Sequence, residues 1–338
     1  MMELTTLWFI LIAVLFIGFF ILEGFDYGVG ILLPFISDRE EERSMVLRTI
    51  GPVWDGNEVW MITAGGALFA AFPHVYATMF STFYLALFLM LLALILRGVA
   101  FELRGRHDSG CWRRTWERAI FFGSFVPALL WGVAVTDLFG GLPINGQMIY
   151  TGNFFDLLSI HSILGGLAFL LVFTFHGASF LTLRLADDGL IQKLRLLARR
   201  IGSLAILAFL LFLGLAFSNT IFAESLPAKL LLLGAAGFFL LGYLAMHRGC
   251  YKGSFLMSTL AIAATTASVF VALFPRLMVS SLNPDWSLTV MNSASTPYTL
   301  SIMTKAALCL VPVVLLYQGW TYWIFRKRVS AEDLKQGH

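Results

Sequence analysis

Charge and cysteine are both scarce in this sequence, and the scarcity of charge excludes a class of protein. Only 13% of the 338 residues are charged, 59% are hydrophobic, and the mean hydropathy is +0.83. A water-soluble protein of this length does not need so much apolar surface. The sequence also lacks the alternating, turn-rich pattern of an outer-membrane barrel, while apolar runs of about twenty residues recur along the chain. It therefore predicts an all-α polytopic membrane protein.

The three cysteines, Cys111, Cys250 and Cys309, show no metal-type spacing. We expect free thiols, with no disulfide and no metal site. The motifs GxxxxGKS, GxGxxG, HExxH and CxxC are missing as well, so no nucleotide-binding, zinc-protease or redox motif assigns a catalytic residue. We expect no catalytic residue in this chain and no nucleic-acid partner.

The apolar runs predict nine transmembrane helices in one domain, residues 1–338, because the connections are too short to hold a soluble domain. The N-terminal run has no positive n-region and no small-residue cleavage site, so we expect it to remain as the first span. The predicted spans are 6–36, 52–72, 75–96, 118–139, 159–182, 201–221, 228–246, 255–275 and 299–325.

Positive charge is distributed unevenly between the connections. The segments after the first, third, fifth, seventh and ninth spans hold 20 of the 23 Lys and Arg residues. Because positive residues concentrate on the cytoplasmic side of a membrane protein, we expect the N-terminus outside and the C-terminus in the cytoplasm. Residues 51–60 and the second half of the first span then lie on the cytoplasmic side.

Two pairs of carboxylates lie within these apolar segments: Glu23 with Asp26, and Asp55 with Glu58. Each pair is three residues apart, so its members share one face of a helix. An acid at mid-membrane costs roughly 2.5–3.5 kcal/mol on insertion scales. The bland interpretation is that all four reach cytoplasmic water and pair with nearby arginines. The functional one is a hydrated path on which each carboxylate relays protons.

Seven glycines lie on the first two predicted spans or directly before the second, so we expect these helices to pack closely and to bring the two acid pairs together. They are Gly24, Gly28, Gly30, Gly51, Gly56, Gly65 and Gly66. Trp60 is either an interfacial anchor or the lining of a cavity. Arg97 is either a positive-inside anchor or the partner of a carboxylate or a cofactor propionate.

The histidines argue against a haem held by this chain. His161 and His176 lie on one predicted helix, about 22 Å apart at helical rise, so they cannot share an iron. A single histidine paired with Met148 or Met291 remains open. We expect each histidine instead to be hydrogen-bonded or solvated.

Five stretches resemble subunit II of the cytochrome bd-type quinol oxidases. They are "EGFDYGVGILLPF" at 23–35, "WDGNEVW" followed by "ITAGGALFAAFP" from residue 54, "YTGNFFDLL" at 150–158, "SASTPYTLSIM" from residue 293, and "VPVVLLYQGWTYW" at 311–323. They occur in order from the first span to the last, so the resemblance covers essentially the whole chain.

This resemblance implies a subunit of a heterodimeric terminal oxidase of the bacterial inner (cytoplasmic) membrane, built as two four-helix bundles plus one extra helix. Such enzymes oxidise quinol and reduce oxygen to water with cytoplasmic protons, which generates a proton gradient. The partner, subunit I, carries haem b, haem d and the quinol-oxidising loop. A structural quinone occupies subunit II in some members, and a small single-helix subunit is a further candidate partner beside lipid and quinone.

Carried over residue by residue, Asp55 resembles the proton-path acid of the family, with Asp26 and Glu23 beside it. Glu58 matches a position held by Glu or Gln in relatives, which argues against an essential titration there. Trp60 and Arg97 resemble residues that border the route of oxygen between the subunits, near the partner's haem.

The short segment "FAESLPAKL" between the sixth and seventh spans suggests the compact, cyanide-insensitive branch of the family. Two other functions stay open. A proton-coupled secondary transporter would use its acids for coupling, although the sequence shows no clear inverted repeat. A purely structural assembly subunit would not need them.

Overall fold

The computed structural model describes residues 2–36 and 39–335, and the regular structure in these consists of helices and one small antiparallel sheet. The α-helices are α1 (Met2–Ile36), α2 (Glu40–Ile50), α3 (Trp54–Ala71), α4 (Pro73–Thr82), α5 (Tyr84–Leu103), α6 (Gly110–Gly140), α7 (Ile160–Arg184), α8 (Asp188–Ser218), α9 (Thr220–Glu224), α10 (Leu226–His247), α11 (Tyr251–Leu273), α12 (Pro297–Ile324) and α13 (Ala331–Lys335). The strands are β1 (Arg276–Met278) and β2 (Leu288–Thr289), and the 3₁₀ turns are η1 (Arg104–Arg106), η2 (Phe154–Leu157) and η3 (Pro284–Trp286).

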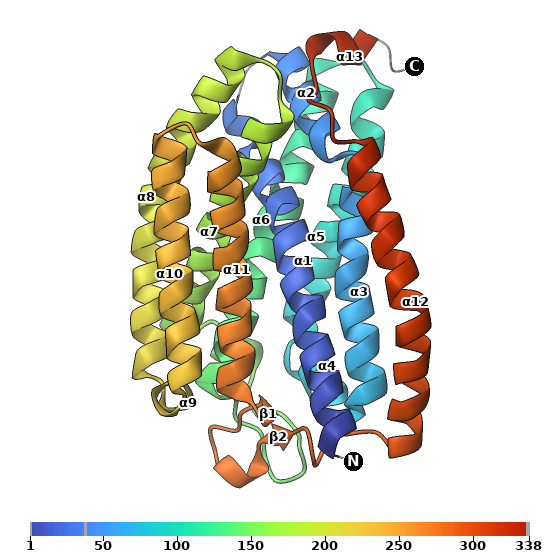
Figure 1. The fold of residues 1–338 in the computed structure, drawn as a ribbon, viewed down its shortest axis with the longest axis vertical. Coiled ribbons are helices and arrows are strands. Elements are labelled where there is room, and N and C mark those ends of the chain that lie inside the picture. The colour runs from blue at the N-terminus through green and yellow to red at the C-terminus, as the bar shows by residue number, and fades with distance from the viewer. Residues whose placement is uncertain (1, 37–38, 336–338) are drawn as a thin grey trace.

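The prediction of an all-α polytopic membrane protein is confirmed. Among the described residues, eight helices are long and apolar enough to cross a membrane: α1, α5, α6, α7, α8, α10, α11 and α12. Helix α3 is not among them because its first two turns are polar, although it runs beside α1 and α12 (Figure 1). The count of nine spans therefore stays a prediction. The expected span 75–96 is divided, since the chain bends at Phe83 between α4 and α5.

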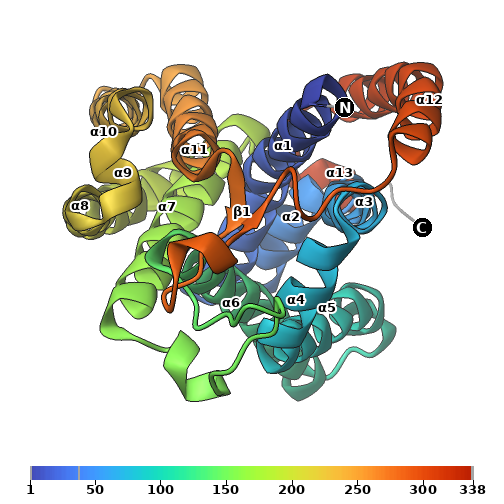
Figure 2. The same ribbon diagram turned by 90° about the horizontal axis from the view of Figure 1, so that it is seen from below.

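The long helices form two groups joined by α1, α6 and α7. One group is a four-helix bundle in which each helix packs on the next: α7, α8, α10 and α11 (Figures 1 and 2). Helices α1, α3, α5 and α6, with the short α4, make the other, and α12 packs against α1 and α3 at its edge. Since α12 touches so little of the protein, almost its whole apolar surface is exposed.

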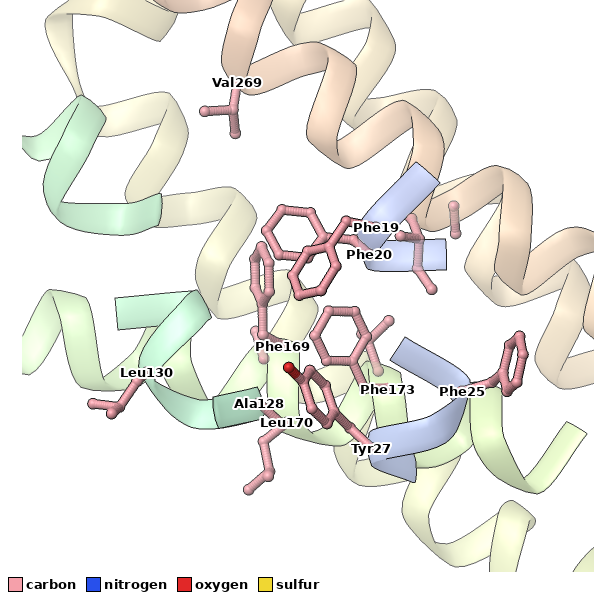
Figure 3. Close-up of a cluster of buried hydrophobic side chains, with 14 of the residues drawn as sticks. Phe19, Phe20, Phe25, Tyr27, Ala128, Leu130, Phe169, Leu170, Phe173 and Val269 are labelled. Carbon is pink, nitrogen blue, oxygen red and sulfur yellow. The ribbon is translucent and has the colours of Figure 1, made fainter. Parts of the chain in front are cut away.

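Aromatic packing and close backbone contact hold α1 in the centre. Figure 3 shows Phe20 of α1 against Phe169 and Phe173 of α7, with ring centroids 5.6 and 6.0 Å apart. Gly28 lies directly on the backbone of Gly177, where a β-carbon would come within 2.1 Å of a carbonyl oxygen. Such contact allows α1 and α7 to approach closely.

The glycines do not join α1 to α3 as we expected. Gly24 and Gly28 face α7, Gly30 faces α6, and Gly56 and Gly65 have nothing within 4 Å of the point where a β-carbon would lie. The first two predicted spans do pack together, but through Trp60 on Gly18 and through polar side chains. Glycine spacing predicts that a helix can be approached closely, and it does not identify the approaching helix.

The described chain begins and ends at opposite ends of the molecule (Figure 1). The segments after α6 and after α11 meet at the end where α1 begins, through a bridge between Leu142 and Ser280 and a hydrogen bond from Ser280 Oγ to the Ile144 carbonyl (2.6 Å). Opposite termini suit an odd number of spans, while the orientation in the membrane stays a prediction.

Candidate functional site

Glu23 and Asp26 are completely buried on α1. Helix α1 is surrounded by α3, α6, α7 and α12, and the spacing of three residues turns both side chains inward. The expectation that this pair shares a face is confirmed. Neither side chain reaches solvent within the described chain, so the bland interpretation is wrong about water for these two acids, while its pairing with an arginine is confirmed for Glu23.

Arg97 of α5 lies between the acids of two other helices. Its Nη1 donates to Glu23 Oε1 and lies 3.8 Å from Glu58 Oε1 of α3. The guanidinium also sits over the ring of Tyr27, 5.0 Å from its centroid. Arg97 is fully buried, and its Nε and Nη2, like Glu23 Oε2, have no hydrogen-bond partner in the described chain. Of the two roles left open for Arg97, the structure gives the partner of a carboxylate.

Asn57 connects α1, α3 and α12. Its Nδ2 donates to Asp26 Oδ2 at 2.7 Å, and its Oδ1 accepts from Tyr322 Oη at 2.8 Å and from Gln318 Nε2 at 3.4 Å. Asp26 Oδ1 has no partner among the described residues. The side chain of Asn57 therefore stands between a buried carboxylate and the outermost helix and is hydrogen-bonded to both.

Trp60 also binds α12, since its Nε1 donates to Gln318 Oε1 at 2.8 Å. Its half-buried indole covers Gly18 so closely that a β-carbon there would lie 2.2 Å from the ring. Gly18 is thus required for this packing. The structure places Trp60 in a contact between three helices and not as an isolated interfacial anchor.

We call seven polar residues in two neighbouring groups the inner network: Arg97 with Glu23 and Glu58, and Asn57 with Asp26, Gln318 and Tyr322. It holds three carboxyl groups and one guanidinium. A single guanidinium thus lies among three carboxyl groups in a low-dielectric interior, where it cannot neutralise all three charges.

Asp55 lies apart from the inner network. It is exposed near the start of α3 and makes no hydrogen bond or ion pair with any residue that the structure describes. Glu58, one turn further along, keeps 19% of its side chain exposed while it approaches Arg97. The expectation that the four acids come together is therefore wrong for Asp55, because the inward face of α3 belongs to Asn57.

Sequence reasoning assigned no role to Asn57, Gln318 or Tyr322. The last two are four residues apart in the motif "YQGWTYW", so they share one face of an otherwise apolar helix, and that spacing could have identified them. It also missed Asp137 of α6, which is buried and accepts a hydrogen bond from Ser162 Oγ of α7. Asn57 and Asp137 are buried, whereas Gln318 and Tyr322 are half-buried.

His176 is buried and fully hydrogen-bonded. Its Nδ1 lies 2.7 Å from Ser258 Oγ and its Nε2 3.2 Å from the Ile21 carbonyl, while its ring stacks on Phe255. A carbonyl can only accept, so Nε2 carries the proton. Neither nitrogen is free for iron, which confirms the expectation of a hydrogen-bonded histidine; His161 is exposed.

A large apolar cavity opens in the half of the molecule away from the inner network. Its volume is about 660 Å³, and side chains from α1, α3, α4, α5, α6 and α11 line it. Phe16, Met79, Trp131 and Thr266 are among them. Its size and apolar lining are those of a site for a small lipophilic molecule.

A family model described as "Cytochrome bd terminal oxidase subunit II" matches residues 4–325. The chain is 43% identical to cytochrome bd ubiquinol oxidase subunit 2 of Bacillus subtilis (strain 168), over 98% of this chain and 99% of that protein. It is 35% identical to cytochrome bd-I ubiquinol oxidase subunit 2 of Escherichia coli (strain K12), over 98% and 96%. A chain in the structure of the bd oxidase from Geobacillus thermodenitrificans shares the fold, with a TM-score of 0.75 at 17% identity, covering 96% of this chain and 100% of that one.

Proposed function

The chain belongs to the family of cytochrome bd terminal oxidase subunit II, and from this premise we propose that its inner network carries protons from the cytoplasm toward the haem-bearing partner subunit. As subunit II, the chain is part of a terminal quinol oxidase and of aerobic respiration. It is a multi-pass membrane protein that works with a haem-containing subunit I.

The finer parts of the proposal concern the partner. We place the protein in the bacterial inner membrane, with haem b and haem d in subunit I, where quinol is oxidised and oxygen reduced to water. No residue of this chain touches the reacting atoms in the proposal. Its contribution is to supply protons and to support subunit I.

The observation that supports this role is the incomplete pairing of buried acids. Glu23 Oε2 and Asp26 Oδ1 are buried without a hydrogen-bond partner in the described chain. Buried polar groups of a stable fold are normally hydrogen-bonded, and each exception needs an explanation. Water molecules on a proton path would supply hydrogen-bond partners for both oxygen atoms. A carboxyl group that relays protons needs such partners, because it must accept a proton from one neighbour and release it to another.

The route follows the exposure of the acids. Exposed Asp55 stands at the entrance, half-buried Glu58 lies one turn deeper, and Glu23 with Arg97 follows in the interior. From Asp26, Asn57 leads to α12, whose surface is the least covered of the long helices. We propose that subunit I receives protons beside α12.

Trp60 remains our candidate for the oxygen route, since it is half-buried between α3 and α12. Arg97 is a weaker candidate, because it lies fully buried against Glu23 and away from any surface that a partner could border.

The apolar cavity fits the structural quinone that the family implies. Its volume of about 660 Å³ suits a quinone ring with part of its isoprenoid tail, and aromatic walls suit both. Phe16 and Trp131 would hold it by packing. A bound quinone would stabilise the fold there, and the proton path does not require it.

The test replaces Asp26 by Asn in the two-subunit oxidase. We expect an assembled enzyme with an unchanged haem spectrum and oxygen consumption slowed on the order of 100-fold, the usual weight of one proton-transfer group. The matched control is Glu117→Gln, a buried carboxylate that pairs with Arg104 outside the inner network. Glu117→Gln should leave turnover unchanged.

Two results would reject the proposal. Wild-type turnover in Asp26→Asn would favour a purely structural subunit, whose acids are incidental. Proton-coupled solute uptake by the chain alone in proteoliposomes would favour a secondary transporter.

A further inference from the structure

Ion pairs neutralise one side of the molecular end at which α2 and η1 lie. Arg104 of η1 binds Glu117 and Glu40, each at 2.7 Å, and Arg43 lies 3.4 Å from Glu117. On the same side Arg113 binds Asp108. Three cations of this side, Arg43, Arg104 and Arg113, are therefore paired with carboxylates of the chain itself.

The other side of the same end carries positive charge without compensation. Helix α8, the turn after α10 and the first turn of α11 hold five cations that form no ion pair with any carboxylate in residues 2–36 and 39–335. These cations are Arg195, Arg199, Arg200, Arg248 and Lys252. Figure 1 shows this side at the upper ends of α8 and α10.

Two of these arginines converge on one oxygen atom. Nη2 of Arg195 and Nη2 of Arg199 both donate to the carbonyl of His247, the second at 2.9 Å. His247 is the last residue of α10, and a helix C-terminus carries about half a negative charge. Two full positive charges at that point leave a local excess, and like charges so close repel each other. An anion would relieve that repulsion.

Exposed apolar side chains continue directly from these arginines. Leu196, beside Arg195, is 57% exposed, and Leu244, one turn before the end of α10, is 41% exposed. Further exposed leucines extend the strip along both helices: Leu204, Leu207, Leu211, Leu240 and Leu241. The positive site thus lies where a membrane-facing surface meets its polar boundary.

We propose that Arg195 and Arg199, with Arg200 beside them, bind the headgroup of an anionic phospholipid whose acyl chains lie along the leucines of α8 and α10. Guanidinium groups suit phosphate because they offer parallel N–H donors as well as charge. Basic pockets at the ends of membrane helices bind such headgroups. The apolar strip distinguishes a lipid from a soluble anion, and the proposal does not depend on the inner network.

The test uses the two-subunit oxidase in nanodiscs and counts retained phospholipid by native mass spectrometry. With phosphatidylglycerol present, we expect one retained lipid that Arg195→Gln/Arg199→Gln binds about 30-fold more weakly, since each arginine near an anionic lipid contributes roughly fivefold. Phosphatidylcholine should not be retained. The matched control, Arg113→Gln/Arg114→Gln, removes the same number of charges from the start of α6, on the other side of this end, and should retain the lipid.

Arg200→Gln provides a second variant, because Arg200 is exposed and makes no hydrogen bond within the described residues. It should fold normally and weaken retention about fivefold. Equal retention in all variants would overturn the proposal, and so would complete competition by inorganic phosphate. The proposal would also be overturned if the α8 variants lost phosphatidylcholine and phosphatidylglycerol equally. It would be overturned as well if subunit I covered these arginines in the lipid-free enzyme.

Discussion

Arg97 and Arg104 lie seven residues apart, which places them two turns apart on nearly the same helical face. Both are buried among carboxylates. Arg104 uses Nε, Nη1 and Nη2 in hydrogen bonds to Glu117, Ser44 and Glu40. Arg97 uses only Nη1, and its Nε and Nη2 are unpaired in the described chain.

The two arginines differ in how completely their hydrogen-bond donors are paired. The surroundings of Arg104 show that this chain can satisfy a buried arginine completely. Near Arg97 the hydrogen bonding is incomplete, because nitrogen atoms of Arg97 and oxygen atoms of Glu23 and Glu58 have no hydrogen-bond partner in the described chain. The unpaired atoms near Arg97 are those that our proposal assigns to a proton path, whereas Arg104 fastens η1 to α2 and α6.

The largest expected effect comes from removing each arginine. Arg97→Gln leaves Glu23 buried without a counter-charge, which costs about 3–5 kcal/mol of unfolding free energy. Arg104→Gln costs less, about 1.5–3 kcal/mol, because Glu117 keeps Arg43 at 3.4 Å. Denaturant unfolding of the solubilised enzyme measures both, and equal costs would remove the distinction.

A double variant sharpens the same comparison. Glu23→Gln/Arg97→Gln removes both charges, so it should regain most of the stability that Arg97→Gln alone loses. Oxygen consumption should stay low, because the relay is still missing its carboxylate. If stability and turnover return together, the network has only a structural role.

The next effect concerns the contact between the inner network and α12. Asn57→Leu leaves Asp26 Oδ2 and Tyr322 Oη without their partner, which costs about 1–3 kcal/mol. We expect faster hydrogen exchange in α12 than in α5, since only α12 depends on Asn57. Unchanged hydrogen exchange in α12 would mean that helix packing alone holds α12 in place without the contact to Asn57. Ser44→Ala, beside Arg104, is the control on the saturated side.

The smallest effect is expected at the exposed acid. Asp55→Asn should lower turnover less than about fivefold, because exposed charges act weakly through water. The loss should shrink at high salt, where such charges are screened. Steady-state oxygen consumption at two ionic strengths measures this. A loss as large as that of Asp26→Asn would make Asp55 part of the relay and not only its entrance.

Hydropathy predicted the fold well because burial in a bilayer depends on the length of each apolar run. Some predicted and observed helix ends agree within about two residues, as for 228–246 against α10, while α6 begins at Gly110 and its predicted span at 118. Helix α8 differs more: it begins at Asp188, because the amphipathic segment with Arg195 and Arg199 continues the same helix outside the apolar run. A search for apolar runs long enough to cross a membrane does not detect such a polar extension.

The site was predictable only in part. Spacing along one helix correctly placed Glu23 with Asp26, since that argument needs only local geometry. It could not predict that Asn57 would meet Tyr322, because 265 residues separate them in sequence. Likewise, the inward face of α3 depends on which helices cover it, and that is why Asn57 faces inward while Asp55 is exposed.

The ion pair of Glu23 with Arg97 also constrains the order of events during biosynthesis. The two residues are 74 positions apart, so at usual translation rates the acid is made about 4–15 s before its counter-charge. During that interval α1 cannot settle in lipid in its final charged form. It must wait protonated, or be sheltered by the insertion machinery, until α5 arrives.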